Sequence, residues 1–453
     1  MNPDLDALHP YPFEKLAALK AALSPSSDLA HIPLTIGEPQ HAPYAAALEA
    51  LHAHQTEFAR YPATAGLPAL RETIAGWASQ RFGLEGLDPD SQVLPVNGTR
   101  EAIFAFVQTA LDRNRAARVA VPNPFYQIYE GATLLAGGQP LYLDCTADNG
   151  FRPDFSAVPA QTWRDVQLVF VCSPGNPTGA VTSLEEYKQL IALADEHDFI
   201  IASDECYSEL YLDEATPPPG LLQACAALGR HDFRRCVVFH SLSKRSNLPG
   251  LRSGFIAGDA DLLTPFKRYR TYHGCAMSLP LQHASIAAWQ DEAHVLANRE
   301  AYREKFAAVT AELAPVMDFP TPEASFYLWP AVPDGDDIAF TQRLYEEMNV
   351  SKLVEEKNKS EGIVESISNP LLVTDEENKI LLMNPKAEEL FNLSEDKVAG
   401  THFLEAIEED QIFDLIQETL ETGQEQAGEA SEVVKFRAGN NEKELYFRVT
   451  TTP

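Results

Sequence analysis

The sequence lacks several features that would indicate other classes of protein. No run of about 18 apolar residues occurs, so no membrane-spanning helix is expected. The first ten residues do not combine a charged start with an apolar core, so no secretory signal is expected either. Six cysteines occur without a C-x-x-C pair or a Cys/His cluster, which favours free thiols in a reducing cytoplasm over a zinc site. A net charge of -31 argues against nucleic acid as a partner, because a basic footprint is missing.

Composition changes after Val350. All six cysteines and all four tryptophans lie before residue 330. Residues 351–453 hold 23 acidic and 10 basic side chains, a balance of 10 − 23 = -13, on under a quarter of the chain. A length of 453 residues allows two or three domains. The charged stretch 351–362 is therefore expected to be a helical linker between a first region, 1–350, and a second, 363–453.

The first region alternates apolar runs with helical patterns. The runs Val166–Cys172, Phe199–Ala202 and Cys236–Phe239 are each followed by polar residues, and Leu184–His197 has a helical pattern. Buried strands that alternate with helices predict an α/β fold with a mostly parallel sheet covered on both faces. Because ligands bind beyond the carboxyl ends of such strands, the polar residues there are candidates for a site.

Lys244 follows the third run, within Ser241–Arg252. A lysine after a strand is ordinarily a solvated surface residue. Here Ser241 and Ser243 precede it and Arg252 follows eight residues later, which are the groups needed to hold a phosphate near an amine. Lysine forms a Schiff base once its amine is neutral. The context therefore favours a covalent cofactor site.

Asp204 and Tyr207 follow the second run. An acid at a buried strand end needs a cationic partner, and a protonated pyridine nitrogen would supply one. Tyr207 would donate a hydrogen bond to the ring oxygen. The alternative is that Asp204 only caps the helix that follows.

Three further segments carry candidate residues. The rigid turn Ser173–Gly179 would aim the Asn176 amide at the ring oxygen, with X-Pro bonds that are candidates for the cis form, although such residues also favour ordinary turns. Gly98 and Thr99 open a helix, which is an anion site. Tyr126 would stack on the ring or belong to the core.

Together these segments resemble the fold-type I aminotransferases, which depend on pyridoxal 5'-phosphate. The resemblance covers residues 1–350 and includes Gly37 in Thr35–Pro39 and the stretch Arg60–Arg71. It implies a large domain of about 45–285 and a small domain formed by 1–44 and 286–350, incomplete at its C-terminal end. It implies these roles: Lys244, Asp204 and Tyr207 catalytic; Gly98, Thr99, Arg100, Tyr126, Asn176, Ser241, Ser243 and Arg252 cofactor-binding; Gly37 and Asn176 substrate-binding; and Tyr61 reaching the phosphate of a partner subunit in a homodimer.

The resemblance also implies a reaction, in which Lys244 moves a proton between the substrate α-carbon and the cofactor. Segments such as Pro122–Ala132 and His240–Asn247 are most similar to bacterial N-succinyldiaminopimelate aminotransferase of lysine biosynthesis, with glutamate and 2-oxoglutarate as the second pair. Amino acids and oxo acids are thus the expected partners, without nucleic acid, membrane or metal.

Two features depart from the family. Its members carry an arginine beyond the helix that here ends at Val350, which binds the substrate carboxylate; no such arginine follows at the usual distance, and Arg448 lies too late. The stretches Ile363–Asp375, Lys379–Phe391 and Val398–Gly400 instead resemble an α+β PAS sensor domain whose last strand would follow Pro453. His402 is its one candidate haem ligand and is ordinarily a loop residue.

Three interpretations follow. The chain is an aminotransferase with an appended sensory or dimerising domain, a cofactor-binding signalling protein with impaired catalysis, or an artificial fusion of two shortened domains.

Overall fold

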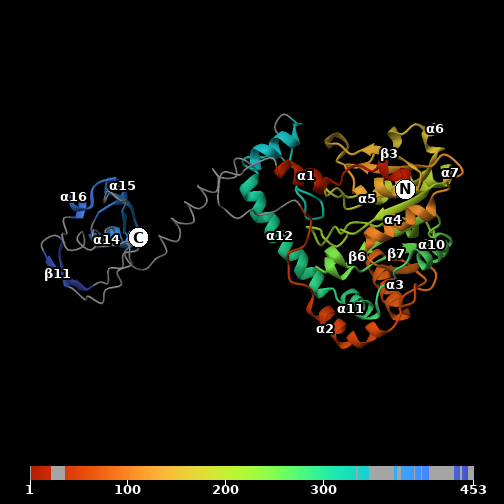
Figure 1. Cartoon of the computed structure of the whole chain (residues 1–453), viewed down its shortest axis with the longest axis horizontal. Coiled ribbons are helices and arrows are strands. Elements are labelled where there is room, and N and C mark those ends of the chain that lie inside the picture. The colour runs from red at the N-terminus through yellow and green to blue at the C-terminus, as the bar shows by residue number, and fades with distance from the viewer. Residues whose placement is uncertain are drawn as a thin grey trace. The chain divides into compact units, whose positions relative to one another are not determined.

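The computed structural model describes residues 2–21, 36–317, 319–332, 335–345, 372–374, 379–391, 393–398, 400–407, 433–438 and 441–446. They belong to two compact units, one running up to Phe340 and the other starting at Thr341 (Figure 1). Among the described helices, none combines the length and the apolar character that crossing a membrane requires.

The first unit is built on a seven-stranded sheet with the order β1-β7-β6-β5-β4-β2-β3. β7 runs antiparallel to both of its neighbours, and all other pairs are parallel. The prediction of a mostly parallel sheet is therefore confirmed. The strands are β1 Val93–Val96, β2 Arg118–Asn123, β3 Gln139–Asp144, β4 Val166–Cys172, β5 Ile200–Asp204, β6 Cys236–Ser241 and β7 Gly254–Gly258.

Helices lie on both faces of this sheet (Figure 1). One apolar core joins it to α3, α7, α8 and α11, and a second joins it to α4, α5 and α10. The helical elements are η1 Pro3–Ala7, α1 Pro12–Ala21, α2 Ala45–Ala53, η2 Gln55–Ala59, α3 Pro68–Phe82, α4 Thr99–Ala110, α5 Gln127–Leu135, η3 Ala147–Asn149, η4 Phe155–Ala157, α6 Ala160–Trp163, α7 Leu184–His197, α8 Leu221–Ala227, α9 Leu242–Arg245, η5 Pro249–Leu251, α10 Ala260–His273, α11 Leu279–Gln290 and α12 Ala293–Leu313.

The two cores follow from the alternation of side chains along each strand. In β4, Val169 and Val171 belong to the first core, whereas Leu168 and Phe170 belong to the second. Burial on both faces explains why the sequence of β4 is apolar at almost every position.

Local signals set the limits of several helices. Ser183 and Glu186 form a capping box at the start of α7, and Asp198 ends it in the left-handed region with φ 62°. The predicted helix Leu184–His197 and the predicted strand Val166–Cys172 have these bounds in the structure. The strands predicted at Phe199–Ala202 and Cys236–Phe239 both run two residues further, to Asp204 and Ser241, and the first begins one residue later, at Ile200.

The domain division expected within residues 1–350 stays a prediction. The sheet lies inside the proposed large domain. Within the proposed small domain, Leu8–Pro12 line a cavity together with α4 and α5. The start of the chain is thus placed against the large domain.

The second unit contains the hairpin β8 Leu372–Thr374 with β9 Ile380–Met383, the helices α14 Pro385–Phe391, α15 Glu395–Val398 and α16 Phe403–Ile407, and the antiparallel pair β10 Val433–Ala438 with β11 Asn441–Tyr446. Its small core is formed by Ile380, Met383, Ala387 and Val398. The Asn384 side chain accepts a hydrogen bond from the Ala387 amide at 2.9 Å, so the predicted Asn cap is present. The expected linker 351–362 and Arg448 lie outside the described residues.

Candidate active site

Three parallel strands bring the predicted polar residues to one edge of the sheet. Cys172 at the end of β4 is paired with Asp204 at the end of β5, and Asp204 is paired with Phe239 in β6. The loop after β4, the segment after β5 and helix α9 after β6 therefore begin side by side. This is the edge at which ligands bind in such sheets.

Asp204 is a buried carboxylate at the centre of this edge. Its Oδ2 accepts a hydrogen bond from the Tyr129 hydroxyl at 2.8 Å, and its Oδ1 accepts one from the Cys206 amide at 3.3 Å. Burial raises the pKa of Asp204, and the bonds from Cys206 and Tyr129 act in the opposite direction. No lysine or arginine among the described residues forms an ion pair with it. Such a carboxylate is suited to a cationic ligand.

Lys244 lies in α9, three residues beyond the end of β6. Its Nζ donates to the carbonyl oxygen of Gly37. The same amine lies 5.0 Å from the ring centre of Phe326 and 5.9 Å from that of Tyr207. Burial lowers the pKa of Lys244 from its usual 10.5 to about 8, so the reactive neutral amine is far more populated than in a surface lysine.

A second group of residues forms a cradle beside the lysine. Gly98 precedes α4 with φ 83° and ψ 155°, a backbone region that is almost restricted to glycine, and a Cβ there would collide with the Arg252 guanidinium. Ser241 Oγ donates to Ser243 Oγ at 2.9 Å and accepts from the Ser243 amide at 3.1 Å. Thr99 Oγ1 lies 3.1 Å from Cys206 Sγ. The combination of a helix start, hydroxyls and a guanidinium is suited to a phosphate.

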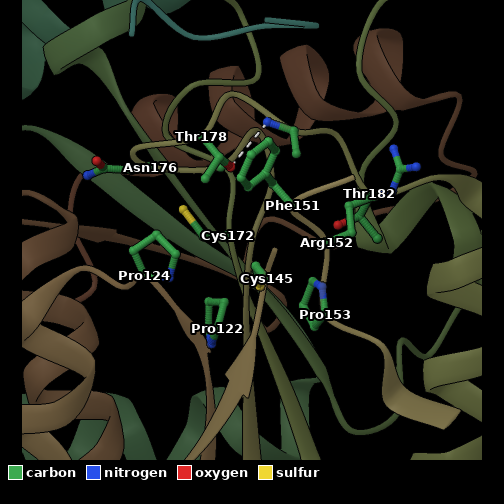
Figure 2. Close-up of a pocket in the computed structure, with 12 residues that line it drawn as sticks. Pro122, Pro124, Cys145, Phe151, Arg152, Pro153, Cys172, Asn176, Thr178 and Thr182 are labelled. Carbon is green, nitrogen blue, oxygen red and sulfur yellow. Dashed lines mark hydrogen bonds between the residues drawn. The ribbon is translucent and has the colours of Figure 1, made fainter. Parts of the chain in front are cut away.

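Tyr207 lies in the segment that follows β5, and Asn176 lies in the loop that follows β4. The Tyr207 hydroxyl is 2.7 Å from that of Tyr327, and burial raises its pKa, so it remains a phenol that donates. Figure 2 shows Asn176 on the loop after β4, near the Cys172 sulfur and Pro124. The bonds Ser173-Pro174 and Asn176-Pro177 of this loop are cis.

Tyr126 packs edge-on against Tyr129, with ring centres 5.8 Å apart at 90°. Burial raises its pKa. Tyr126 thus packs against a core residue, Tyr129, which is itself hydrogen-bonded to Asp204 of the candidate site. Its role as a stacking residue stays a prediction.

Arg100 and Tyr61 are the two remaining residues of the predicted site. Arg100 Nη2 donates to the Tyr11 hydroxyl at 3.0 Å, and its guanidinium lies 5.4 Å from the Tyr11 ring centre. Its predicted contact with the cofactor is not among these bonds and stays a prediction. The Tyr61 side chain is 102 % exposed, which is consistent with the prediction that it serves another subunit.

Four residues at the site were not singled out from the sequence, namely Tyr129, Cys206, Phe326 and Tyr327. Tyr129 lies in the first turn of α5, three residues beyond the N-cap Tyr126, and this closeness in sequence could have identified it. Phe326 and Tyr327 reach the site through backbone bonds, Ser325 N to Leu210 O at 2.7 Å and Ala324 N to Gly179 O at 3.2 Å. The one sequence feature that could have indicated them is that two aromatic residues, Phe326 and Tyr327, stand side by side after α12.

The residues present fit pyridoxal phosphate. The buried carboxylate of Asp204 would hold the protonated ring nitrogen, the start of α4 at Gly98 with the adjacent Arg252 guanidinium would hold the phosphate, and the Lys244 amine would form the covalent link. Each of these three features is costly or unusual in a protein without such a ligand.

Comparisons with known proteins support the same reading. The family model for aminotransferase class I and II matches residues 30–354, and that for the PAS fold matches residues 358–453. The LL-diaminopimelate aminotransferase of Desulforudis audaxviator is 36% identical over 296 residues, which are 64% of this chain and 73% of the relative. That of Nitratidesulfovibrio vulgaris is 32% identical over 76% of this chain and 88% of its own.

Solved structures of aminotransferases are also similar to this chain. An aminotransferase from Neisseria meningitidis has 50% identity and a TM-score of 0.73 over 76% of this chain and 88% of its own. A probable N-succinyldiaminopimelate aminotransferase from Thermus thermophilus has 27% identity and a TM-score of 0.65 over 74% and 87%. The chain therefore belongs to the class I and II aminotransferases, which are transferases that depend on pyridoxal phosphate, and carries a PAS domain after that region.

Proposed function

We propose that this aminotransferase acts on a diaminopimelate-type amino acid, with N-succinyl-diaminopimelate as the first candidate, and exchanges its amino group with 2-oxoglutarate in lysine biosynthesis. The observation that carries the catalytic part is the meeting of Lys244, Asp204 and the Gly98–Arg252 cradle at one sheet edge. The substrate part is supported by the names of the relatives, which include free and N-succinylated diaminopimelate.

The proposed roles follow from the contacts. The bound cofactor supplies an electron sink for the carbanion at the substrate α-carbon. Lys244 Nζ would accept the proton from that carbon and deliver it to the cofactor, a task suited to an amine whose pKa is about 8. The Asp204 carboxylate, oriented by Tyr129, keeps the ring nitrogen protonated. Tyr207 and Asn176 hydrogen-bond the ring oxygen, and Gly98, Thr99, Ser241, Ser243 and Arg252 bind the phosphate.

We further propose a homodimer in the cytoplasm. The exposed Tyr61, with the exposed Phe58 and Tyr272, supports a contact with a second copy, in which Tyr61 would bind the partner's phosphate. All six cysteines are unpaired, which supports a reducing compartment.

The experiment is a pair of assays on the full chain loaded with pyridoxal phosphate. First, L-glutamate is added alone, and loss of the cofactor's visible absorbance reports the half-reaction. Second, kcat/KM is compared for N-succinyl-LL-diaminopimelate and free LL-diaminopimelate with 2-oxoglutarate. A higher value for the free amino acid would overturn the choice of the succinylated substrate but leave transamination standing.

Lys244→Ala is expected to abolish both activities, whereas Lys267→Ala, a change at an exposed lysine in α10, is the matched control and is expected to retain them. The PAS match directly after the aminotransferase region favours one alternative, a cofactor-binding regulatory protein with impaired catalysis. A protein that binds the cofactor but stays unchanged with every amino donor would support that alternative and refute the enzyme proposal.

A further inference from the structure

Two histidines and a glutamate gather outside the candidate active site. His54 follows α2, Glu57 lies in η2 and His283 lies in α11. Their donor atoms all lie within 4.8 Å of one another: Glu57 Oε1 is 2.9 Å from His54 Nδ1 and 3.6 Å from His283 Nε2. All three side chains are half-buried. The cluster therefore combines a chain segment and a helix that are more than 200 residues apart in sequence.

The donor spacing matches that of a small metal site. Zinc ligands at about 2.1 Å in a tetrahedron lie about 3.4 Å from one another, between the two distances found here. Two imidazoles and one carboxylate are a ligand set that zinc and similar ions accept, and a fourth position would stay open to water. The carboxylate also supplies negative charge, so the site favours a cation.

The ring arrangement requires one adjustment. The His54 and His283 rings are stacked, with centres 3.5 Å apart and planes at 9°. A metal lies in the plane of each imidazole that binds it, so one of two parallel rings must turn. The His54 side chain is 39% exposed and stands at the end of α2, so it is the ring that would turn. His283, 25% exposed and held in α11, would stay in place.

We propose that His54, Glu57 and His283 bind one divalent transition-metal ion, with Zn²⁺ as the representative, and thereby fasten η2 to α11. Glu57 lies four residues before Tyr61, the residue that the proposed function assigns to the partner subunit's phosphate. The metal site does not depend on that assignment, since its ligands come from one chain and contact none of the candidate active-site residues.

The test is a zinc titration of the full chain by calorimetry. Cys275→Ser is introduced in every protein compared, because this exposed thiol would itself bind zinc. His283→Ala and Glu57→Gln remove ligands, and His52→Ala, a change at an exposed histidine of α2, is the matched control. Retained cofactor absorbance shows that each variant is folded.

One zinc ion per chain is expected to bind the parent and His52→Ala alike, with affinity reduced at least about tenfold in His283→Ala and in Glu57→Gln. Zinc should also raise the melting temperature of the parent but not of these two variants. Equal affinity in all four proteins, or no stoichiometric binding in the parent, would overturn the proposal. Neither result bears on transamination, which is measured separately with metal-free protein.

Discussion

Replacing Gly98 by alanine tests the phosphate cradle. The change has two separable effects. A backbone at φ 83° and ψ 155° costs a residue with a Cβ about 1–3 kcal/mol, which lowers the free energy of unfolding of the first unit. In addition, the new methyl group meets the Arg252 guanidinium, which must move. A displaced guanidinium loses its charge-assisted bond to the phosphate, worth about 1.5–3 kcal/mol, so the cofactor should bind roughly 10- to 150-fold more weakly.

Gly83→Ala separates these effects. Gly83 ends α3 in the left-handed region, with φ 63° and ψ 40°, and a Cβ there meets nothing within 4 Å. This variant should lose about 1–2 kcal/mol of stability but bind the cofactor as the parent does. Stability is measured by denaturant unfolding of the cofactor-free proteins, and affinity by titrating pyridoxal phosphate and following its absorbance. If Gly98→Ala binds the cofactor as tightly as Gly83→Ala, the cradle is wrongly assigned.

Three further changes test other parts of the structure. Lys244→Met should raise the free energy of unfolding of the cofactor-free protein at pH 7 by up to about 3 kcal/mol, because the parent buries an amine whose pKa falls from 10.5 to about 8. Between these two pH values the unfolded parent binds more protons than the folded parent, so the parent's stability rises with pH. The advantage of the variant should therefore disappear toward pH 10.5. Denaturant unfolding at pH 7 and pH 10 measures it, and an equal gain at both would contradict the reasoning. Tyr129→Phe removes a hydrogen bond that lowers the pKa of Asp204, so the acidic limb of the pH–rate profile with glutamate should move to higher pH. An acidic limb at the same pH in the variant would show that Tyr129 does not tune Asp204. Asn384→Ala removes the cap of α14 and should cost the second unit about 0.5–2 kcal/mol, measured by thermal unfolding, with the exposed Lys386→Ala as control.

Much of the fold follows from local pattern. Strands buried on both faces are apolar throughout, so β4 and β6 could be located from the sequence, and the capping box at Ser183 defines the start of α7. The antiparallel direction of β7 could not be predicted, because strand direction depends on the connection from β6 through α9 and η5 rather than on the residues of Gly254–Gly258. The closeness of Asp204 to the segment Ser241–Lys244 could be predicted, because both follow parallel strands whose carboxyl ends lie at the same edge of the sheet.

Thr99 and Arg100 show how neighbours on one helix make different contacts. They are adjacent in the sequence, and both were predicted to bind the cofactor. Successive side chains on a helix point about 100° apart. Thr99 turns toward Cys206, at the strand ends, whereas Arg100 turns toward Tyr11 in the N-terminal segment. That contact joins positions 89 residues apart, and no local pattern indicates it.

The basicity of Lys244 is likewise a property of the folded chain. Its position follows from the sequence, but its pKa of about 8 results from burial, and the rings of Tyr207 and Phe326 beside its amine come from distant segments of the chain. At pH 7 an amine with this pKa is neutral roughly 300 times more often than one that titrates at 10.5. Segment 324–327 is held by the backbone bonds from Ala324 to Gly179 and from Ser325 to Leu210, so loosening it would expose Lys244 and return its pKa toward the usual value. The sequence motif thus identifies the candidate lysine, whereas the burial of its amine beside Tyr207 and Phe326 determines how much of that amine is neutral.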